Sequence, residues 1–214
     1  MDLAEITTEV FRRLAEDQVS PDFWTVADVH EAINDGYEEI SDASEWFERM
    51  VSIPLLDHRP YYDLRTVLDG DTILSPGRCL NVTTQRWMDP THVRNLDYHT
   101  YRRWEAIAAS QIEKFFQRGL WWMGVFPQQG SDSGFIRFFY TAMPSPLVLD
   151  TDTPGFPQEF HYALVDYALG DLKGQEAETK LALTEWKKYF AQEAALTLYV
   201  QGRQKEDRIN ALHG

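Results

Sequence analysis

The C-terminal part of the chain carries the feature that most restricts the fold. Between residues 160 and 200, apolar side chains recur every three or four positions, which is the spacing of one face of an α-helix. These positions are Phe160, Ala163, Leu164, Tyr167, Ala168, Leu172, Leu181, Trp186, Phe190, Ala194 and Leu198. Gly174 lies where a first helix would end. We expect two long helices here, the second over residues 175–200 and roughly 39 Å in length.

The N-terminal part also has helical spacing, over residues 3–17 and again from Thr25. Thr25 and Asp28 have the spacing of a helix N-terminal capping box. Beyond them, acidic and apolar residues fall on opposite faces of the predicted helix. The acidic stripe consists of Asp28, Glu31, Asp35, Glu38, Glu39, Asp42 and Glu45. Two explanations fit the acidic stripe. It is either a solvated face that aids solubility, or a surface that stays near a polyanion without binding it.

The middle of the chain has a different pattern, in which short alternating apolar runs are separated by proline, glycine and aspartate. Two aromatic-rich runs stand out, GLWWMGVF at residues 119–126 and GFIRFFYT at residues 134–141. The segment between them is rich in turn residues, so we expect the two runs to form a β-hairpin with a longer loop.

These patterns together predict an α+β fold that is mainly helical. The N-terminal helices and the two long C-terminal helices would form a bundle, with a β-rich insert in the middle. The predicted parts are a helical bundle from residues 1–47 and 157–200, a β-rich insert with a hairpin at residues 48–156, and a C-terminal tail at residues 201–214.

Charge and composition exclude several classes of protein. The formal net charge is −14, and residues 1–50 hold 14 of the 34 acidic residues but only three basic ones. A broad nucleic-acid-binding face would need clustered lysine and arginine. With one cysteine, Cys79, no disulfide can form within the chain. We expect no membrane span and no signal peptide, because no apolar run is long enough and the first residues lack the pattern.

Residue patterns that suggest catalysis or metal binding are incomplete. Residues 30–34 (HEAIN) begin like a zinc-protease helix, but Asn34 stands where the second histidine is required. Residues 132–134 (DSG) are similar to the tripeptide around a serine-protease nucleophile, but Phe135 replaces the second glycine. We therefore expect no catalytic residue, no metal ion and no cofactor, and the chain is not predicted to be an enzyme.

Several segments, taken in order, resemble the head-to-tail connector (adaptor) proteins of tailed bacteriophages. Residues 156–196 contain the run ALVDYAL and then a long helix with the sequence WKKY, and the strand FIRFFYTAMPSPLVLD precedes them. Residues 61–74 (YYDLRTVLDGDTIL) are similar to the region before the β-rich insert of such proteins. Gly170 departs from the pattern, since the related helices more often carry a larger residue there, and glycine weakens a helix by up to about 1 kcal/mol.

The resemblance implies a structural virion protein. Similar adaptors form a ring, commonly a dodecamer, in the virion neck between the portal and the tail, after assembly in the host cytoplasm. The implied partners are other copies of the chain, the portal protein and downstream tail or neck proteins. DNA would pass through the ring during ejection without specific binding.

Two sets of residues gain a possible role from this resemblance. The acidic stripe would face the channel, where repulsion of phosphate lets DNA slide. The tail would become ordered when it docks on the portal. Its candidate docking residues are Arg203, Arg208, Ile209 and Leu212.

Two other classes of function fit the same sequence. An acidic cytosolic binding module, or a regulatory mimic of DNA, would use the same acidic stripe. A small enzyme with a dispersed site, such as a glycosidase with distant carboxylates, would show no local motif. Formation of a ring separates the adaptor from both.

Overall fold

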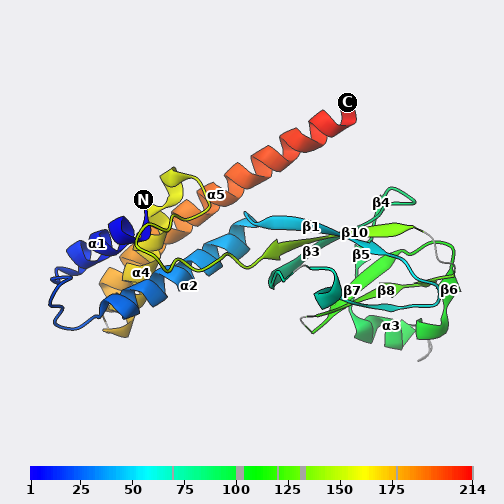
Figure 1. Ribbon diagram of the computed structural model, residues 1–214, viewed down its shortest axis with the longest axis horizontal. Coiled ribbons are helices and arrows are strands. Elements are labelled where there is room, and N and C mark those ends of the chain that lie inside the picture. Colours follow the sequence, from blue (N-terminus) through cyan, green and yellow to red (C-terminus); the bar gives the residue numbers. More distant parts are fainter. Residues whose placement is uncertain (69, 100–103, 120, 131–133, 177, 214) are drawn as a thin grey trace. The chain divides into compact units, whose positions relative to one another are not determined.

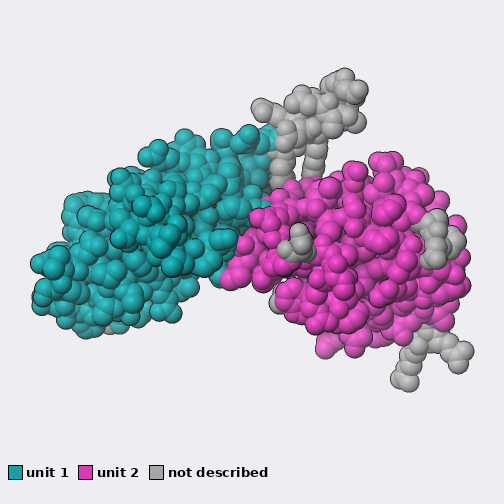
Figure 2. Space-filling model, in the orientation of Figure 1, with its two compact units in different colours: residues 1–47, 144–214 teal, residues 48–143 magenta. Residues whose placement is uncertain are grey.

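The computed structural model describes most of the chain as two compact units. The residues outside the description are 69, 100–103, 120, 131–133, 177 and 214, together with the side chains of residues 99 and 204–213. Unit 1 comprises residues 1–47 and 144–214, and unit 2 comprises residues 48–143 (Figure 2). Unit 2 is therefore an insertion between two segments of unit 1.

Unit 1 is built from four α-helices around one apolar core (Figure 1). The helices are α1 (Leu3–Leu14), α2 (Val26–Ser44), α4 (Tyr162–Gln175) and α5 (Thr179–His213), with a 3-10 turn η3 (Gln158–Phe160) before α4. Helix α4 packs against each of the other three. This central place explains why α4 is apolar on almost every side, with Ala163, Leu164 and Val165 all fully buried.

The predicted capping box at the start of α2 is confirmed. The Thr25 hydroxyl accepts a hydrogen bond from the backbone N–H of Asp28 at 3.3 Å, and the Asp28 carboxylate accepts one from the backbone N–H of Thr25 at 2.9 Å. Helix α1 begins with a second box, formed by Asp2 and Glu5. Both boxes satisfy backbone donors that a helix start otherwise leaves unpaired.

The segment that leads from unit 2 into α4 belongs to unit 1, although it was expected in the insert. Its backbone carbonyls at Asp150 and Asp152 accept hydrogen bonds from the N–H groups of Ala4 and Leu3, at 3.0 and 2.8 Å. The Asn34 side chain of α2 bonds both backbone groups of Leu147, accepting at 2.7 Å and donating at 3.0 Å. Asn34 is thus a structural residue that ties an extended segment to α2.

Unit 2 contains short strands in three sheets, with α3 (Val93–His99) and the 3-10 turns η1 (Leu64–Thr66) and η2 (Trp104–Ala106) between them. The described strands are β1 (Glu48–Pro54), β2 (Tyr61–Asp63), β3 (Ile73–Asn81), β4 (Arg86–Trp87), β5 (Asp89–Pro90), β6 (Ala108–Ala109), β7 (Lys114–Arg118), β8 (Trp122–Phe126), β9 (Gln128–Gln129) and β10 (Phe135–Ala142). The strand orders are β1-β10-β3-β4, β2-β8-β7-β5 and β6-β9.

The first and last strands of unit 2 are neighbours. Strands β1 and β10 pair antiparallel along their whole length, from Glu48 opposite Thr141 to Pro54 opposite Phe135. The chain therefore enters and leaves unit 2 through two adjacent strands.

The predicted hairpin between residues 119–126 and 134–141 is wrong. Both runs form strands, but β8 pairs with β2 and β7, whereas β10 pairs with β1 and β3. Gly119, with a positive φ of 63°, lies in the turn that joins β7 to β8 instead. Aromatic side chains on both runs suit burial in either sheet, so their closeness in the chain alone did not decide which strands pair.

The prediction of a mainly helical fold with two long C-terminal helices is also wrong. Helices account for 44% of the chain and strands for 23%. Of the two C-terminal helices, α4 has only 14 residues, whereas α5 has 35. The helical spacing predicted both helices but not their lengths. Helix α4 is limited by the 3-10 turn η3 before it and by its end at Gln175. Helix α5 continues through residues that were expected to form the tail.

Gly170 is explained by close packing between α4 and α5. A Cβ atom at this position would lie 2.9 Å from Cε2 of the Trp186 indole, which is closer than van der Waals contact allows. At Gly174, one turn further along α4, nothing lies within 4 Å of the same point. Packing against Trp186 therefore requires a glycine at position 170, whereas no such contact requires one at position 174.

We expect Gly170→Ala to lower the free energy of unfolding by about 1–2 kcal/mol, because overpacking outweighs the gain in helix propensity. Gly174→Ala should instead raise it by up to about 1 kcal/mol, since only the propensity changes. Urea denaturation followed by circular dichroism measures both. Equal effects of the two substitutions would contradict this account of Gly170.

Candidate functional site

Helices α2, α4 and α5 form an open groove with aromatic walls on unit 1. The groove has a volume of about 470 Å³. It is lined by Glu39 of α2, Tyr167 of α4, and Leu183, Trp186, Tyr189 and Phe190 of α5. We call these six residues the aromatic groove. Leu183 and Phe190 are 54% and 57% exposed, so no described element covers this apolar surface.

Edge-to-face ring contacts hold the groove in shape. The Tyr167 ring lies 4.9 Å from the Trp186 ring, and the two are nearly perpendicular. Trp186 and Phe190, one turn apart on α5, stack at 5.9 Å. Aromatic pairs at these separations are favourable beyond the area that they bury. The groove is therefore pre-formed rather than created by a partner.

The groove has an unsatisfied polar atom in its lining. The Tyr189 side chain is fully buried, and its hydroxyl has no hydrogen-bond partner among the described residues. Burial raises the pKa of Tyr189, and the nearby carboxylates of Glu193 and Glu39 raise it further. The Tyr189 phenol therefore stays neutral at pH 7.

The acidic stripe lies on the surface of α2, next to this groove. Glu31, Asp35, Glu39, Asp42 and Glu45 are exposed, and Asp28 and Glu38 are half-buried. The Asp28 carboxylate takes part in the capping box, and the hydrogen bonds that it accepts from Thr25 lower the pKa of Asp28. Burial raises the pKa of Glu38, and the charge of Asp35 raises it further. Glu39 belongs to both surfaces, so the stripe and the groove are continuous.

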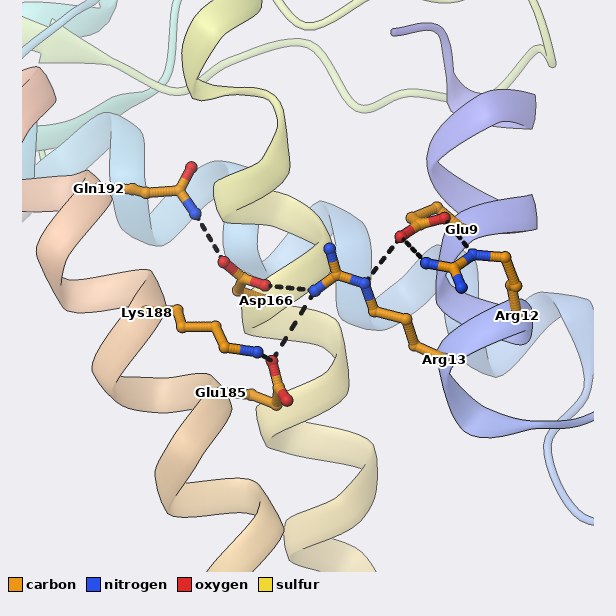
Figure 3. Close-up of polar contacts among 7 residues, drawn as sticks. All are labelled: Glu9, Arg12, Arg13, Asp166, Glu185, Lys188 and Gln192. Carbon is orange, nitrogen blue, oxygen red and sulfur yellow. Dashed lines mark hydrogen bonds and ion pairs between the residues drawn. The ribbon is translucent and has the colours of Figure 1, made fainter.

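A network of charged side chains connects α1, α4 and α5 (Figure 3). Its centre is Asp166 of α4, which is 3% exposed. Arg13 of α1 donates to one Asp166 oxygen at 2.9 Å, and Gln192 of α5 donates to the other at 2.6 Å. Burial raises the pKa of Asp166, and the charge of Arg13 opposes that shift. Because a buried carboxylate must be paired, these contacts fix how the three helices meet.

Arg13 is held in turn by further acids. Its Nε atom donates to Glu9 at 2.7 Å, and its Nη1 atom lies 3.9 Å from a Glu185 oxygen. Lys188 donates to the same Glu185 oxygen at 2.7 Å. Glu9 also accepts two hydrogen bonds from Arg12, at 2.6 and 2.7 Å. The Arg12 hydrogen bonds lower the pKa of Glu9 to about 2, and those from Arg13 add to this effect.

The sequence reasoning missed the network and the groove. The signal for the network was Asp166 itself, an acid within the apolar run ALVDYAL, because an acid on a buried face needs a partner. Arg13 lies 153 positions away, so only the fold identifies it. The groove left no such local signal, because its apolar residues have the same spacing as the core residues around them.

The predicted tail residues are only partly placed. The α5 helix continues to His213, and the Arg203 guanidinium carbon lies 5.7 Å from the centre of the Tyr199 ring. The side chains of Arg208, Ile209 and Leu212 lie outside the described residues. The last described core residue of α5 is Val200.

The described residues contain no cluster of three or more histidine, cysteine or acidic side chains that could hold a metal ion. Cys79 is fully buried, and burial raises its pKa to about 12, so it stays a thiol at neutral pH. Residues 132 and 133 of the DSG tripeptide lie outside the described part of the chain. Among the helices that the structure describes, none is long and apolar enough to cross a membrane.

We expect Glu9→Gln to lower the free energy of unfolding at pH 7 by about 1 kcal/mol or less, because solvent screens a pair at the edge of unit 1. Glu9 has a lower pKa in the folded protein than in the unfolded chain. Its contribution is therefore present above pH 4.5 and disappears as the pH falls towards 2. Urea denaturation at pH 7 and pH 3 should show the difference from wild type shrinking at pH 3, and Glu31→Gln, at an exposed position, serves as the control. If the difference in unfolding free energy between wild type and Glu9→Gln were the same at both pH values, the lowered pKa of Glu9 would be contradicted.

The model of the SU10 adaptor protein family matches residues 1–212, which include both units. No curated protein matches the chain. The match supports the resemblance to phage head-to-tail adaptors and makes the chain a structural bacteriophage protein that interacts with other phage assembly proteins. The chain belongs to the SU10 adaptor protein family.

Proposed function

We propose that this protein forms a ring between the portal and the tail of the virion, around the channel through which DNA passes. The observation that carries the proposal is the family match over residues 1–212, which spans the helical unit and the β unit together. The proposed ring is a dodecamer in the neck of the virion, assembled in the host cytoplasm. Downstream tail or neck proteins would bind its other end.

The surface of unit 1 supports a role in assembly. A closed ring repeats one heterologous contact, so each subunit needs two different side surfaces. An exposed, pre-formed groove with aromatic walls has the composition of such a surface, because tyrosine, tryptophan and phenylalanine are enriched at interfaces. The charged network holds α1, α4 and α5 together.

The distribution of charge supports a place for the acidic stripe on the channel wall. Unit 2 holds 10 of the 34 acidic and 11 of the 20 basic residues, a net charge of +1, which leaves −15 on unit 1. A negative wall repels phosphate and lets DNA slide through without adsorbing. We propose that α2 presents the stripe to the DNA.

We expect the triple variant Glu31→Gln, Asp35→Asn, Asp42→Asn to assemble into virions but to release DNA several-fold more slowly. All three side chains are exposed, so the fold should not change. DNA release is followed by the fluorescence of a DNA-binding dye after triggering. A matched control removes three exposed acids elsewhere on unit 1, at Asp22, Asp150 and Glu159, and should release DNA at the normal rate. Normal release by the stripe variant would count against a channel role for the stripe.

The C-terminal end of α5 is proposed to dock on the portal. Residues 201–213 continue the helix beyond Val200, the last described side chain in the core of unit 1. Among the described side chains, none beyond Val200 belongs to this core, so we propose that the rest of the helix binds a partner. Arg203, Arg208, Ile209 and Leu212 are the candidate contacts.

Co-expression of this chain with the portal protein of the same phage tests both ideas. Electron microscopy in negative stain should show a second ring stacked coaxially on the portal ring. A chain that ends at Val200 should remain folded but bind the portal at least tenfold more weakly, as measured by co-purification and circular dichroism. Full binding by the shortened chain would reject the docking role of residues 201–214 while leaving the ring intact.

A folded chain that never associates with the portal would instead favour the alternative function. The net charge of −15 on unit 1 then points to an acidic binding module or a DNA mimic. Tight one-to-one binding to a basic DNA-binding protein would be the result expected of that class.

A further inference from the structure

The β1-β10-β3-β4 sheet of unit 2 has a face on which large apolar side chains are exposed among the described residues. Ile136, Phe138 and Tyr140 of β10 are buried on one side of the sheet, so the residues that alternate with them lie on the other side. The strand register places Met50 opposite Phe139 on this outer side. Met50, Trp87 and Phe135 are 49%, 52% and 52% exposed. We call the arginine face the set Met50, Arg78, Trp87, Phe135, Arg137 and Phe139.

An arginine of this face is held between aromatic rings. The Arg78 guanidinium carbon lies 4.9 Å from the centre of the Trp87 ring and 5.6 Å from that of Phe139. The Arg78 Nη2 atom donates a hydrogen bond to the Glu48 carboxylate at 3.0 Å. Arg137 is exposed on the same side of the sheet. Tryptophan and arginine are the residue types most enriched among interface hot spots. The arginine face therefore has the composition of a binding surface.

The aromatic groove of unit 1 complements this face in chemistry. The groove is apolar and its carboxylate, Glu39, lies beside the rest of the acidic stripe. The arginine face is apolar and carries two arginines. The units that bear them have net charges of −15 and +1. Opposite charges at the edges of two apolar surfaces favour their association and oppose the pairing of each surface with itself.

We propose that the aromatic groove of one copy of this chain binds the arginine face of the next copy. The proposal rests on the ring function proposed above, because a ring repeats one contact between two different surfaces. Each copy carries one groove and one arginine face, on different units, so the contact can repeat from copy to copy. Groove-to-groove pairing is disfavoured because it would bring the acidic residues Glu39 and Asp35 against their own equivalents.

Two substitutions at exposed positions test the two surfaces one at a time. Phe190→Ser alters only the groove, and Trp87→Ser alters only the arginine face. Sedimentation of the full chain at concentrations up to about 1 mM, where contacts of millimolar Kd are detectable, should show wild type growing beyond its monomer mass of 24.9 kDa. Each variant alone should associate at least tenfold more weakly. Phe23→Ser, at an exposed phenylalanine outside both surfaces, should behave as wild type.

Mixing the two variants provides the decisive measurement. Phe190→Ser keeps its arginine face and Trp87→Ser keeps its groove, so the mixture should form one-to-one dimers and nothing larger. Dimerisation by Trp87→Ser alone would show groove-to-groove pairing and overturn the proposal. A monomeric wild type, or a mixture that does not pair, would also overturn it. If a ring still forms on the portal in those cases, the adaptor function survives and only this interface is rejected.

Discussion

The contact between Arg13 and Asp166 constrains the rest of unit 1. Asp166 lies on the central helix and uses both carboxylate oxygens, one toward α1 and one toward α5. Apolar contacts tolerate a shift between helices, whereas a buried carboxylate that loses its partner costs several kcal/mol. The next residue along α4, Tyr167, lies against Trp186 and Tyr189 of α5. The register that satisfies Asp166 is therefore also the register that builds the aromatic groove.

The two units differ in how they use charge. Unit 1 concentrates acids on α2 and carries a net charge of −15. Unit 2 is close to neutral, and some of its arginines stack on aromatic rings, as Arg78 does on Trp87 and Arg118 on Tyr61. A stacked guanidinium keeps its charge while it covers apolar area. The proposed contact between copies would use this difference in charge within one chain.

Helix identity could be predicted from the sequence, because apolar spacing and a capping box are local signals. The Thr25 and Asp28 box lies where the sequence indicated it. Strand pairing could not be predicted in the same way, because it depends on contacts between distant parts of the chain. Strand β10 pairs with β1 and β3, which are far from it in the sequence, and not with β8, which is near. The same limit applies to the candidate site. The acids of the stripe are neighbours on one helix, whereas the groove joins Glu39, Tyr167 and Trp186 from three helices.

The pairing of β1 with β10 has a consequence for how such a protein can change over evolutionary time. The ends of unit 2 lie side by side, and facing residues of antiparallel strands have Cα atoms only about 4.5–5.5 Å apart. A module with neighbouring ends can be replaced by another of different size without stretching the host domain, since closing a longer loop adds little entropy cost. Recombination between phages could thus exchange unit 2 as a cassette while the helices of unit 1, and the contacts that hold them, stay unchanged.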